Sequence, residues 1–137
     1  MAIAVEVSMT ARLFLHSAMV VYILGLMGCS ECSNRGLSRA AAPDGVRAAV
    51  VFERSCGATT PFSVHVSLVP AEARLKNEAG NLFIADNNRG VLSAKRLRET
   101  EVQWISENRL VIYYPEGVRI FLQRTESDGI SIIYKYK

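Results

Sequence analysis

The feature that most constrains the fold is a series of β-type segments near the C-terminus, separated by short turns. The segments are rich in β-branched and aromatic residues and read VQWIS, LVIYY, VRIFLQR and ISIIYKY. The turns between them read ENR, PEG and ESDG, and the pair Asp128–Gly129 suits a tight hairpin. Strands joined by such turns are typical of antiparallel sheets. Residues 101–136 are therefore predicted to form an antiparallel meander.

Further β-type segments precede this region, and they read VRAAVVFER (46–54), FSVHVSLV (62–69) and NLFIAD (81–86). In the second of them, apolar residues alternate strictly with polar ones. Such alternation is typical of a half-buried strand, and it places His65 on the solvated face.

The two stretches between these strands are less regular. Residues 70–80 suit two turns of helix that end at Gly80. Residues 91–100 contain a basic cluster, made of Lys95, Arg96 and Arg98. This cluster is interpreted as part of a solvated strand or loop, and contact with anionic lipid head groups or an acidic partner is the alternative.

Together the segments predict an all-β fold, with one antiparallel sheet domain of about seven strands and at most one short helix after the N-terminal signal. A bent sheet, a small sandwich and an open barrel all satisfy this pattern. The length of 137 residues suits one domain. The residues expected to contribute to the core are Phe62, Val64, Val66, Phe83, Trp104, Ile112, Phe121 and Ile132.

The N-terminal region carries the apolar excess of the chain. Arg12 precedes an apolar run over 13–27, which is short for a membrane span and has the layout of a secretory signal. The run ends in Leu-Met-Gly-Cys (26–29), which resembles the lipobox of bacterial lipoproteins. In such proteins the signal is cleaved before the cysteine, and the cysteine is acylated. The sequence thus predicts lipid attachment at Cys29, and an uncleaved membrane helix with an incidental cysteine is the alternative.

These features divide the chain into three parts. Residues 1–28 are predicted to be a signal peptide, with Met9 as the expected true start. Residues 29–42, which are mostly small and polar, are predicted to be a lipidated tether. Residues 43–137 form the predicted β-domain. Ser30 after the cysteine favours the outer membrane over the inner one, with the domain on the periplasmic face of the cell envelope.

The other two cysteines, Cys32 and Cys56, lie outside the cytosol in this interpretation, and two such thiols most simply form one disulfide. A zinc site made of Cys29, Cys32, Cys56 and His65 is a rival, but it needs the sulfur that the lipobox uses. A catalytic pair of Cys56 and His65 is a second rival, and a disulfide would remove its nucleophile. No metal or other cofactor is predicted.

Composition and motifs narrow the function classes. The net charge of +3 is small and evenly spread, which argues against nucleic acid as a partner. The chain shows no nucleophile elbow, phosphate loop or metal-ligand spacing, so no catalytic residue is assigned and the protein is not expected to be an enzyme. Paired carboxylates stay open as a catalytic arrangement, because Glu53, Asp86 and Glu107 are free to meet in space.

Two motifs resemble a known group of proteins. The stretches FERSCGATTPFS (52–63) and GNLFIAD (80–86) are similar to the cores of a group of small proteobacterial proteins. Those cores read Phe-x-Arg-x-Cys-Gly-Ala-Thr-Thr and Gly-Asn-x-Phe-x-Ala-Asp. The activity of the group is unknown, so the resemblance assigns no role to any residue.

The same stretches suggest a local site. Thr59 and Thr60 can bond to the nearby backbone, as in an ordered loop beside a disulfide. The alternative is a binding loop in which Arg54, Thr59, Thr60 and Asp86 face a shared cleft for a small polar ligand or a peptide. The sequence is thus interpreted as a lipid-anchored envelope protein that binds or scaffolds, with the membrane and an envelope protein as partners. A small periplasmic hydrolase or an enzyme inhibitor is the alternative.

Overall fold

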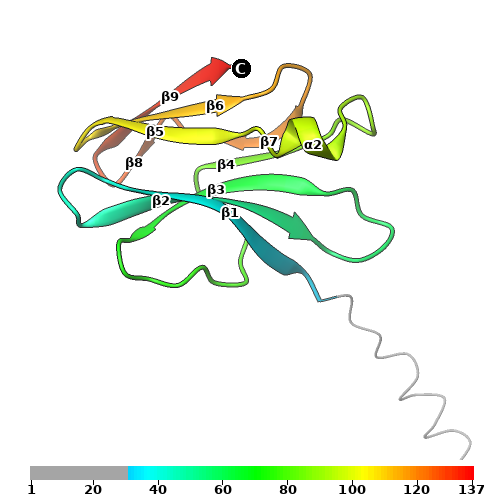
Figure 1. Ribbon diagram of the computed structural model, residues 1–137, viewed down its shortest axis with the longest axis horizontal. Coiled ribbons are helices and arrows are strands. Elements are labelled where there is room, and N and C mark those ends of the chain that lie inside the picture. Colours follow the sequence, from blue (N-terminus) through cyan, green and yellow to red (C-terminus); the bar gives the residue numbers. More distant parts are fainter. Residues whose placement is uncertain (1–30) are drawn as a thin grey trace, which may run out of the picture. The chain divides into compact units, whose positions relative to one another are not determined.

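The computed structural model describes residues 31–137, and their strands form two sheets that pack against each other (Figure 1). The first sheet has the spatial order β1 (Ser33–Ala41), β2 (Arg47–Ser55), β3 (Ser63–Pro70), β4 (Phe83–Asp86) and β7 (Arg119–Gln123). The second has the order β5 (Glu101–Ser106), β6 (Arg109–Tyr114), β9 (Ile130–Tyr136) and β8 (Glu126–Ser127). One short helix, α2 (Ala94–Leu97), links β4 to β5. The predicted all-β fold class is confirmed.

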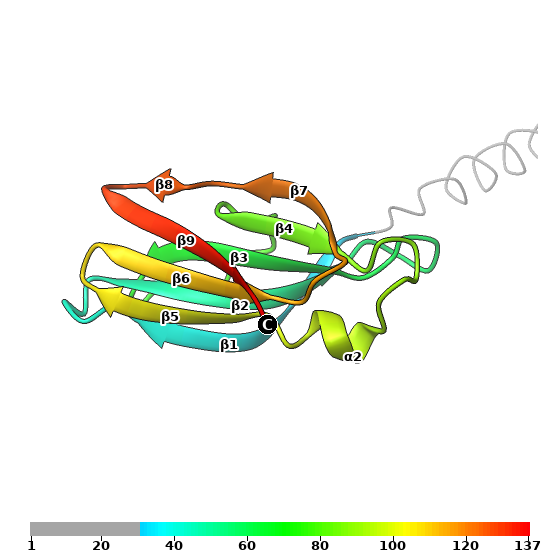
Figure 2. The same ribbon diagram turned by 90° about the horizontal axis from the view of Figure 1, so that it is seen from above.

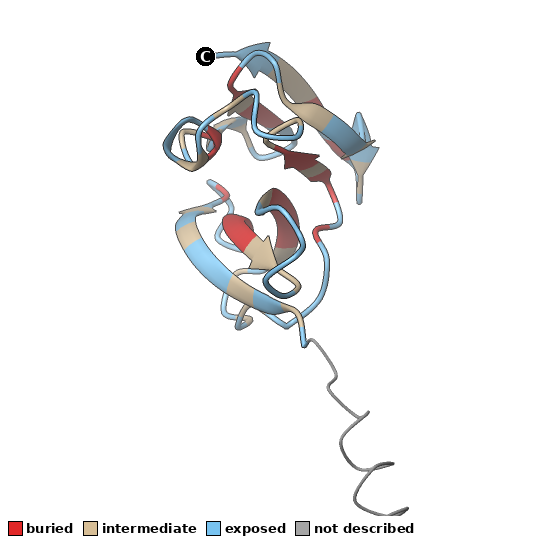
Figure 3. Ribbon diagram, turned by 90° about the vertical axis from the view of Figure 1, so that its right-hand side faces the viewer, coloured by how far each residue is buried: buried red, intermediate tan, exposed pale blue. Residues whose placement is uncertain are grey.

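The core lies between the two sheets (Figure 3). Its buried side chains come from both layers, among them Val51 and Phe83 of the first sheet and Ile112 of the second. The ring of Phe83 packs against Tyr114 and Tyr134, with ring centroids 5.2 and 5.7 Å away. The two sheets also meet along one side, where the indole N–H of Trp104 on β5 donates to the carbonyl oxygen of Ala40 on β1 at 2.9 Å.

Most of the predicted core residues are buried, namely Val64, Val66, Phe83, Ile112 and Ile132, and Trp104 is half-buried. The prediction is wrong for Phe62, which is 44% exposed, and for Phe121, which is 59% exposed. Phe62 precedes the first residue of β3, so strand alternation does not apply to it. Phe121 is the extra residue of a β-bulge between β4 and β7, and a bulge breaks the alternation of side chains.

The C-terminal third departs from the predicted meander. The hairpin of β5 and β6 is present, and so is the hairpin of β8 and β9, whose turn holds Asp128 and Gly129 at φ 51° and 76°. However, β7 does not join the second sheet and pairs instead with β4 in the first. The edge of β6 that a meander would give to β7 is occupied by β9, which runs parallel to β6. The meander prediction is therefore wrong beyond Tyr114.

The predicted tether is also wrong for residues 33–41, which form β1 and pair with β2 along its whole length. An edge strand needs little apolar surface, since main-chain hydrogen bonds to one neighbour hold it in place. Side chains of β1 are accordingly exposed or half-buried, and Leu37 at a bulge packs against the core. The predicted signal peptide and Cys29 lie outside the described residues.

Residues 71–82 connect β3 to β4 without the predicted helix. We call them the covering segment, because they lie over the outer face of the first sheet. Their polar groups bond to that sheet instead of to one another: the carbonyls of Lys76 and Glu78 accept from the Asn34 side chain at 2.9 and 2.7 Å. The helix lies instead at α2, where the Ser93 hydroxyl caps the N-terminus by accepting from the backbone N–H of Arg96.

Candidate functional site

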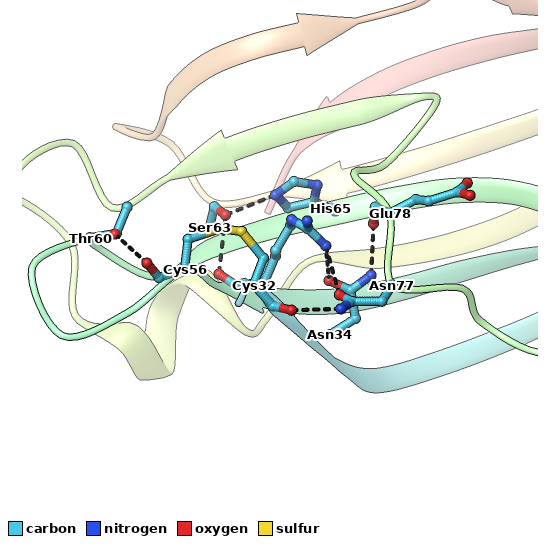
Figure 4. Close-up of a disulfide and its surroundings, with 9 residues drawn as sticks. Cys32, Asn34, Cys56, Thr60, Ser63, His65, Asn77 and Glu78 are labelled. Atoms are coloured by element: carbon cyan, nitrogen blue, oxygen red, sulfur yellow. Dashed lines mark hydrogen bonds between the residues drawn. A yellow bond between two sulfur atoms is a disulfide. The ribbon is translucent and has the colours of Figure 1, made fainter. Parts of the chain in front are cut away.

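A disulfide joins the start of β1 to the end of β2 (Figure 4). The sulfur atoms of Cys32 and Cys56 are 2.10 Å apart, and their Cα atoms are 3.9 Å apart. This confirms the predicted pairing. Because both thiols are used in the bond, neither the rival zinc site nor the rival catalytic pair of Cys56 and His65 can form. Further bonds fix both ends: Asn77 donates to the carbonyl of Cys32 at 2.7 Å, and the Thr60 hydroxyl donates to the carbonyl of Cys56 at 3.0 Å.

A polar row crosses the first sheet beside this disulfide. Its members are directly paired on five neighbouring strands, and they are Asn34, Arg54, Ser63, Asp86 and Arg119. Directly paired residues of neighbouring strands point to the same face of a sheet. All five side chains therefore lie on the outer face, away from the second sheet.

Arg54 carries the one guanidinium of this row that is not matched by a carboxylate. It donates to the side-chain oxygens of Asn34 at 2.7 Å and Asn77 at 3.2 Å. Within residues 31–137 it forms no salt bridge. A half-buried guanidinium held by neutral amides keeps its positive charge available to an anionic group of a ligand or partner.

Asp86 and Arg119 close the row with an ion pair. Both carboxylate oxygens of Asp86 accept from the guanidinium of Arg119, and this pairing raises the pKa of Arg119. Asp86 is buried and also accepts from the backbone N–H of Asn88 at 2.8 Å. Its charge is thus used within the fold, where it fixes the loop after β4.

His65 lies on the same face of the sheet as the row, two residues along β3 from Ser63, and it is buried. The prediction that this residue lies on a solvated face is therefore wrong. The ring is covered by the covering segment, whose Gly80 donates its backbone N–H to Nδ1 of His65 at 2.8 Å. A side chain on Gly80 would meet Cβ of His65 at 2.9 Å, so the segment approaches this closely because residue 80 is glycine. Phe52 packs beside the ring with centroids 5.3 Å apart. The alternation of residues in β3 does not predict this burial, because the residue that covers the ring, Gly80, lies 15 positions further along the chain.

The hydrogen bonds of His65 fix its tautomer. A backbone N–H can only donate, so Nδ1 accepts and the ring proton of the neutral imidazole resides on Nε2. Nε2 lies 2.8 Å from the hydroxyl of Ser63, to which it therefore donates. A serine nucleophile needs the opposite arrangement, in which the imidazole accepts the hydroxyl proton. Ser63 is thus not activated by His65, although the two residues are in contact.

The three carboxylates that were open as a catalytic set are not brought together. Glu53 lies on the inner face of β2, where it pairs with Arg98 at 2.7 Å and Arg35 at 3.3 Å. Burial raises the pKa of Glu53, but the two guanidinium groups outweigh it and the net shift is downward. Asp86 lies on the opposite face, and Glu107 is exposed in the turn between β5 and β6.

The predicted binding loop is brought together in part. Arg54 and Asp86 share the polar row on either side of Ser63. Thr59 and Thr60 are exposed in the loop between β2 and β3, and the Thr60 hydroxyl is used locally, as in the alternative of an ordered loop. Sequence reasoning missed the other members of this site, which are Asn34, Asn77 and Arg119.

We expect His65 to make stability depend on pH. Burial, and to a lesser extent the charge of Arg54, lowers the pKa of His65 to about 4 from its ordinary 6.5. The unfolded chain therefore binds more protons between these two values, and the folded state loses stability as the pH falls from 6.5 towards 4. The loss should be about 2 kcal/mol.

Urea denaturation at several pH values measures this loss. His65→Gln keeps a side-chain oxygen that can accept from Gly80 but does not titrate, so its stability should change much less between pH 6.5 and 4.5. Glu53 supplies a separate acid dependence at lower pH, since its lowered pKa contributes stability that is lost only as the pH falls through that value. An unchanged slope in the His65 variant would show that the ring is not the responsible group.

Three kinds of comparison with known proteins found no relative: no family model, no curated protein and no solved structure matches the chain. Within residues 31–137, no group of three or more His, Cys, Asp and Glu side chains is arranged to hold a metal ion. Across that same region, no helix has the length and apolar character needed to cross a membrane. Function is therefore inferred from the chemistry of this chain alone.

Proposed function

We propose that this chain is a lipid-anchored cell-envelope protein whose β-domain binds or scaffolds another envelope component. Residues 1–28 serve as its signal peptide and Cys29 carries the lipid. The observation that supports this most is the disulfide Cys32–Cys56, which begins three residues after the cysteine of the Leu-Met-Gly-Cys motif. Disulfides persist in oxidising compartments such as the periplasm, which is where a lipobox would deliver the domain.

The anchor and the fold have separate chemistry in this proposal. Each buried methylene of an acyl chain contributes roughly 0.8 kcal/mol of membrane affinity, and stable anchoring takes more than one chain. The acyl chains alone hold the protein at the membrane, and no core residue of the domain is needed for anchoring. Its buried apolar residues are already used between the two sheets.

Binding is assigned to the polar row. Arg54 supplies a positive charge without a carboxylate partner in the described part of the chain, the Asn34 amide oxygen holds it in place, and Ser63 supplies a hydroxyl beside it. These groups suit an acidic side chain of an envelope protein or a small polar ligand. A periplasmic hydrolase or an enzyme inhibitor is the alternative. The contact of Ser63 with His65 favours a hydrolase, and the tautomer of His65 counts against it.

We expect Cys29→Ala to abolish lipidation and to leave the uncleaved precursor, because the acyl chains are attached through that sulfur before cleavage. Intact-mass spectrometry of envelope protein should show a chain that retains its signal peptide and carries no acyl mass. The matched control is Cys32→Ser, which removes the disulfide and should leave acylation and cleavage unchanged. Identical masses for wild type and Cys29→Ala would refute the anchor.

The binding half is tested with the lipidated protein as bait in solubilised envelope. Arg54→Gln removes the charge and should reduce capture of the specific partner at least several-fold. Arg109→Gln is the matched control, because Arg109 is exposed on β6 of the other sheet and forms no salt bridge in the described structure. Equal capture by the three baits would exclude the polar row as the binding surface.

A further inference from the structure

One end of the domain combines exposed apolar and basic side chains close to the predicted anchor. The loops 57–62 and 87–93 both leave the first sheet there, because β2 ends, β3 begins and β4 ends at the polar row. Helix α2 belongs to the same end, since Arg98 at its C-terminus pairs with Glu53 of β2. Figure 2 shows these loops, α2 and the start of β1 at the same end of the domain. We call this surface the anchor-side end.

The position of Cys29 limits how far this end can move from a membrane. An extended chain spans at most about 3.6 Å per residue, so the Cα atom of Cys29 lies within about 11 Å of that of Cys32. Cys32 is fixed to Cys56, from which the loop 57–62 continues. If Cys29 carries lipid, the anchor-side end is therefore held at the membrane surface. This step rests on the proposed function.

The side chains exposed at this end suit such a surface. Phe62 is 44% exposed and Val91 is 72% exposed, so both present apolar surface at this end. Arg89 and Lys95 are exposed too, and neither forms a salt bridge within the described residues. The stretch 87–99 holds four basic residues and one acidic residue.

The loop that carries Arg89 and Val91 is well defined by its own hydrogen bonds. The backbone N–H of Leu92 donates to the carbonyl of Asn87 at 3.1 Å, and that of Asn88 donates to Asp86. Asn88 and Arg89 have φ values of 51° and 56°. Left-handed backbone is costly for a residue such as Arg89, so the hydrogen bonds of the loop hold Arg89 in a backbone conformation that free chain would rarely adopt.

We propose that the anchor-side end rests on a membrane that contains anionic phospholipid. Phe62 and Val91 enter the boundary between head groups and acyl chains, where apolar side chains are stabilised. Arg89 and Lys95 contact the phosphate groups, since juxtamembrane basic residues are attracted to an anionic leaflet. The lipid surface is favoured over an acidic protein because the short link to Cys29 brings the membrane itself to this end.

Hydrogen–deuterium exchange of the lipidated full-length mature protein tests the proposal. The protein is placed in vesicles of phosphatidylcholine alone and in vesicles that also contain phosphatidylglycerol. Backbone amides in loops 57–62 and 87–93 should exchange several-fold more slowly in the anionic vesicles. The double variant Arg89→Glu with Lys95→Glu should lose this slowing. The control is Arg109→Glu with Arg124→Glu, which makes the same charge change at two exposed sites at the opposite end of the strands and should retain it.

The failure of this proposal can be told apart from the failure of the anchor. Intact mass is measured first, and a mature chain without acyl mass would overturn both proposals. With the lipid confirmed, equal exchange in the two kinds of vesicle would overturn the membrane contact alone. Slowing that appears only when an acidic protein fraction of the envelope is added would also overturn it, because the partner of this end would then be a protein.

Discussion

Replacing Cys56 with serine should lower the free energy of unfolding by about 3 kcal/mol, because the disulfide closes a loop in the unfolded chain between cysteines 24 positions apart. It also holds β1, an edge strand with few buried side chains, against β2. Without it, the start of β1 is retained by main-chain hydrogen bonds and by the contacts of Asn34 and Asn77. We therefore expect a cooperative fold of reduced stability instead of an unfolded chain.

Urea denaturation of the detergent-solubilised protein measures this loss. Wild-type protein treated with a reductant should match the Cys56→Ser variant, and the variant itself should be insensitive to the reductant. If the proposed acylation at Cys29 takes place, it should be the same in both proteins. A wild-type midpoint that does not move on reduction would mean that the disulfide contributes nothing to stability.

Phe83→Ala should destabilise the domain by about 3–5 kcal/mol, the range for removing a large aromatic side chain from a core. Phe83 is fully buried on β4 and packs against Tyr114 of β6 and Tyr134 of β9. Removal of the ring leaves a cavity between the two sheets that neither layer can close without moving the other. The expected result is a large drop in the denaturation midpoint, or loss of folded protein from the envelope.

Phe121→Ala is the matched control, because it deletes the same side chain at a site that is 59% exposed. The ring of Phe121 makes a cation–π contact with Arg119, whose guanidinium carbon lies 4.9 Å from the ring centroid. The change in stability should stay below about 1 kcal/mol. If both phenylalanine variants lost the same stability, the assignment of the core to the space between the sheets would be wrong.

The comparison of these two phenylalanines shows what local sequence determines. Alternation in β3 correctly places Val64 and Val66 in the core, because a regular strand forces every second side chain to one face. The same logic fails at Phe121, since a bulge depends on how β7 meets β4 and not on the residues of β7 alone. Turn chemistry likewise predicts the hairpins of β5–β6 and β8–β9. It does not reveal that β7 changes sheets, which allows β6 and β9 to pair in parallel.

The candidate site divides in the same way. The disulfide can be predicted from sequence, because the lipobox interpretation assigns Cys29 to the lipid and leaves two cysteines for one oxidising compartment. The burial of His65 needs the covering segment, whose Gly80 and Asn81 bond to β3 from positions well beyond that strand in the sequence. Asn81 bonds to both backbone groups of Leu68 through its side chain, and no local pattern marks an asparagine for that use. The polar row is invisible in sequence because its five members come from five strands.

The hydrogen bond from Trp104 to the carbonyl of Ala40 makes tryptophan fluorescence a reporter of the contact between β5 and β1. Trp104 is the only tryptophan of the chain, so its emission reports on a single place, the side where β5 approaches β1. Detachment of β1 would release the indole N–H to water and shift the emission to longer wavelength, even while the core around Phe83 stays intact. Fluorescence and far-ultraviolet circular dichroism should therefore give different transitions if the first strand opens before the rest of the domain. Coincident transitions would mean that the first strand is lost only when the whole domain unfolds.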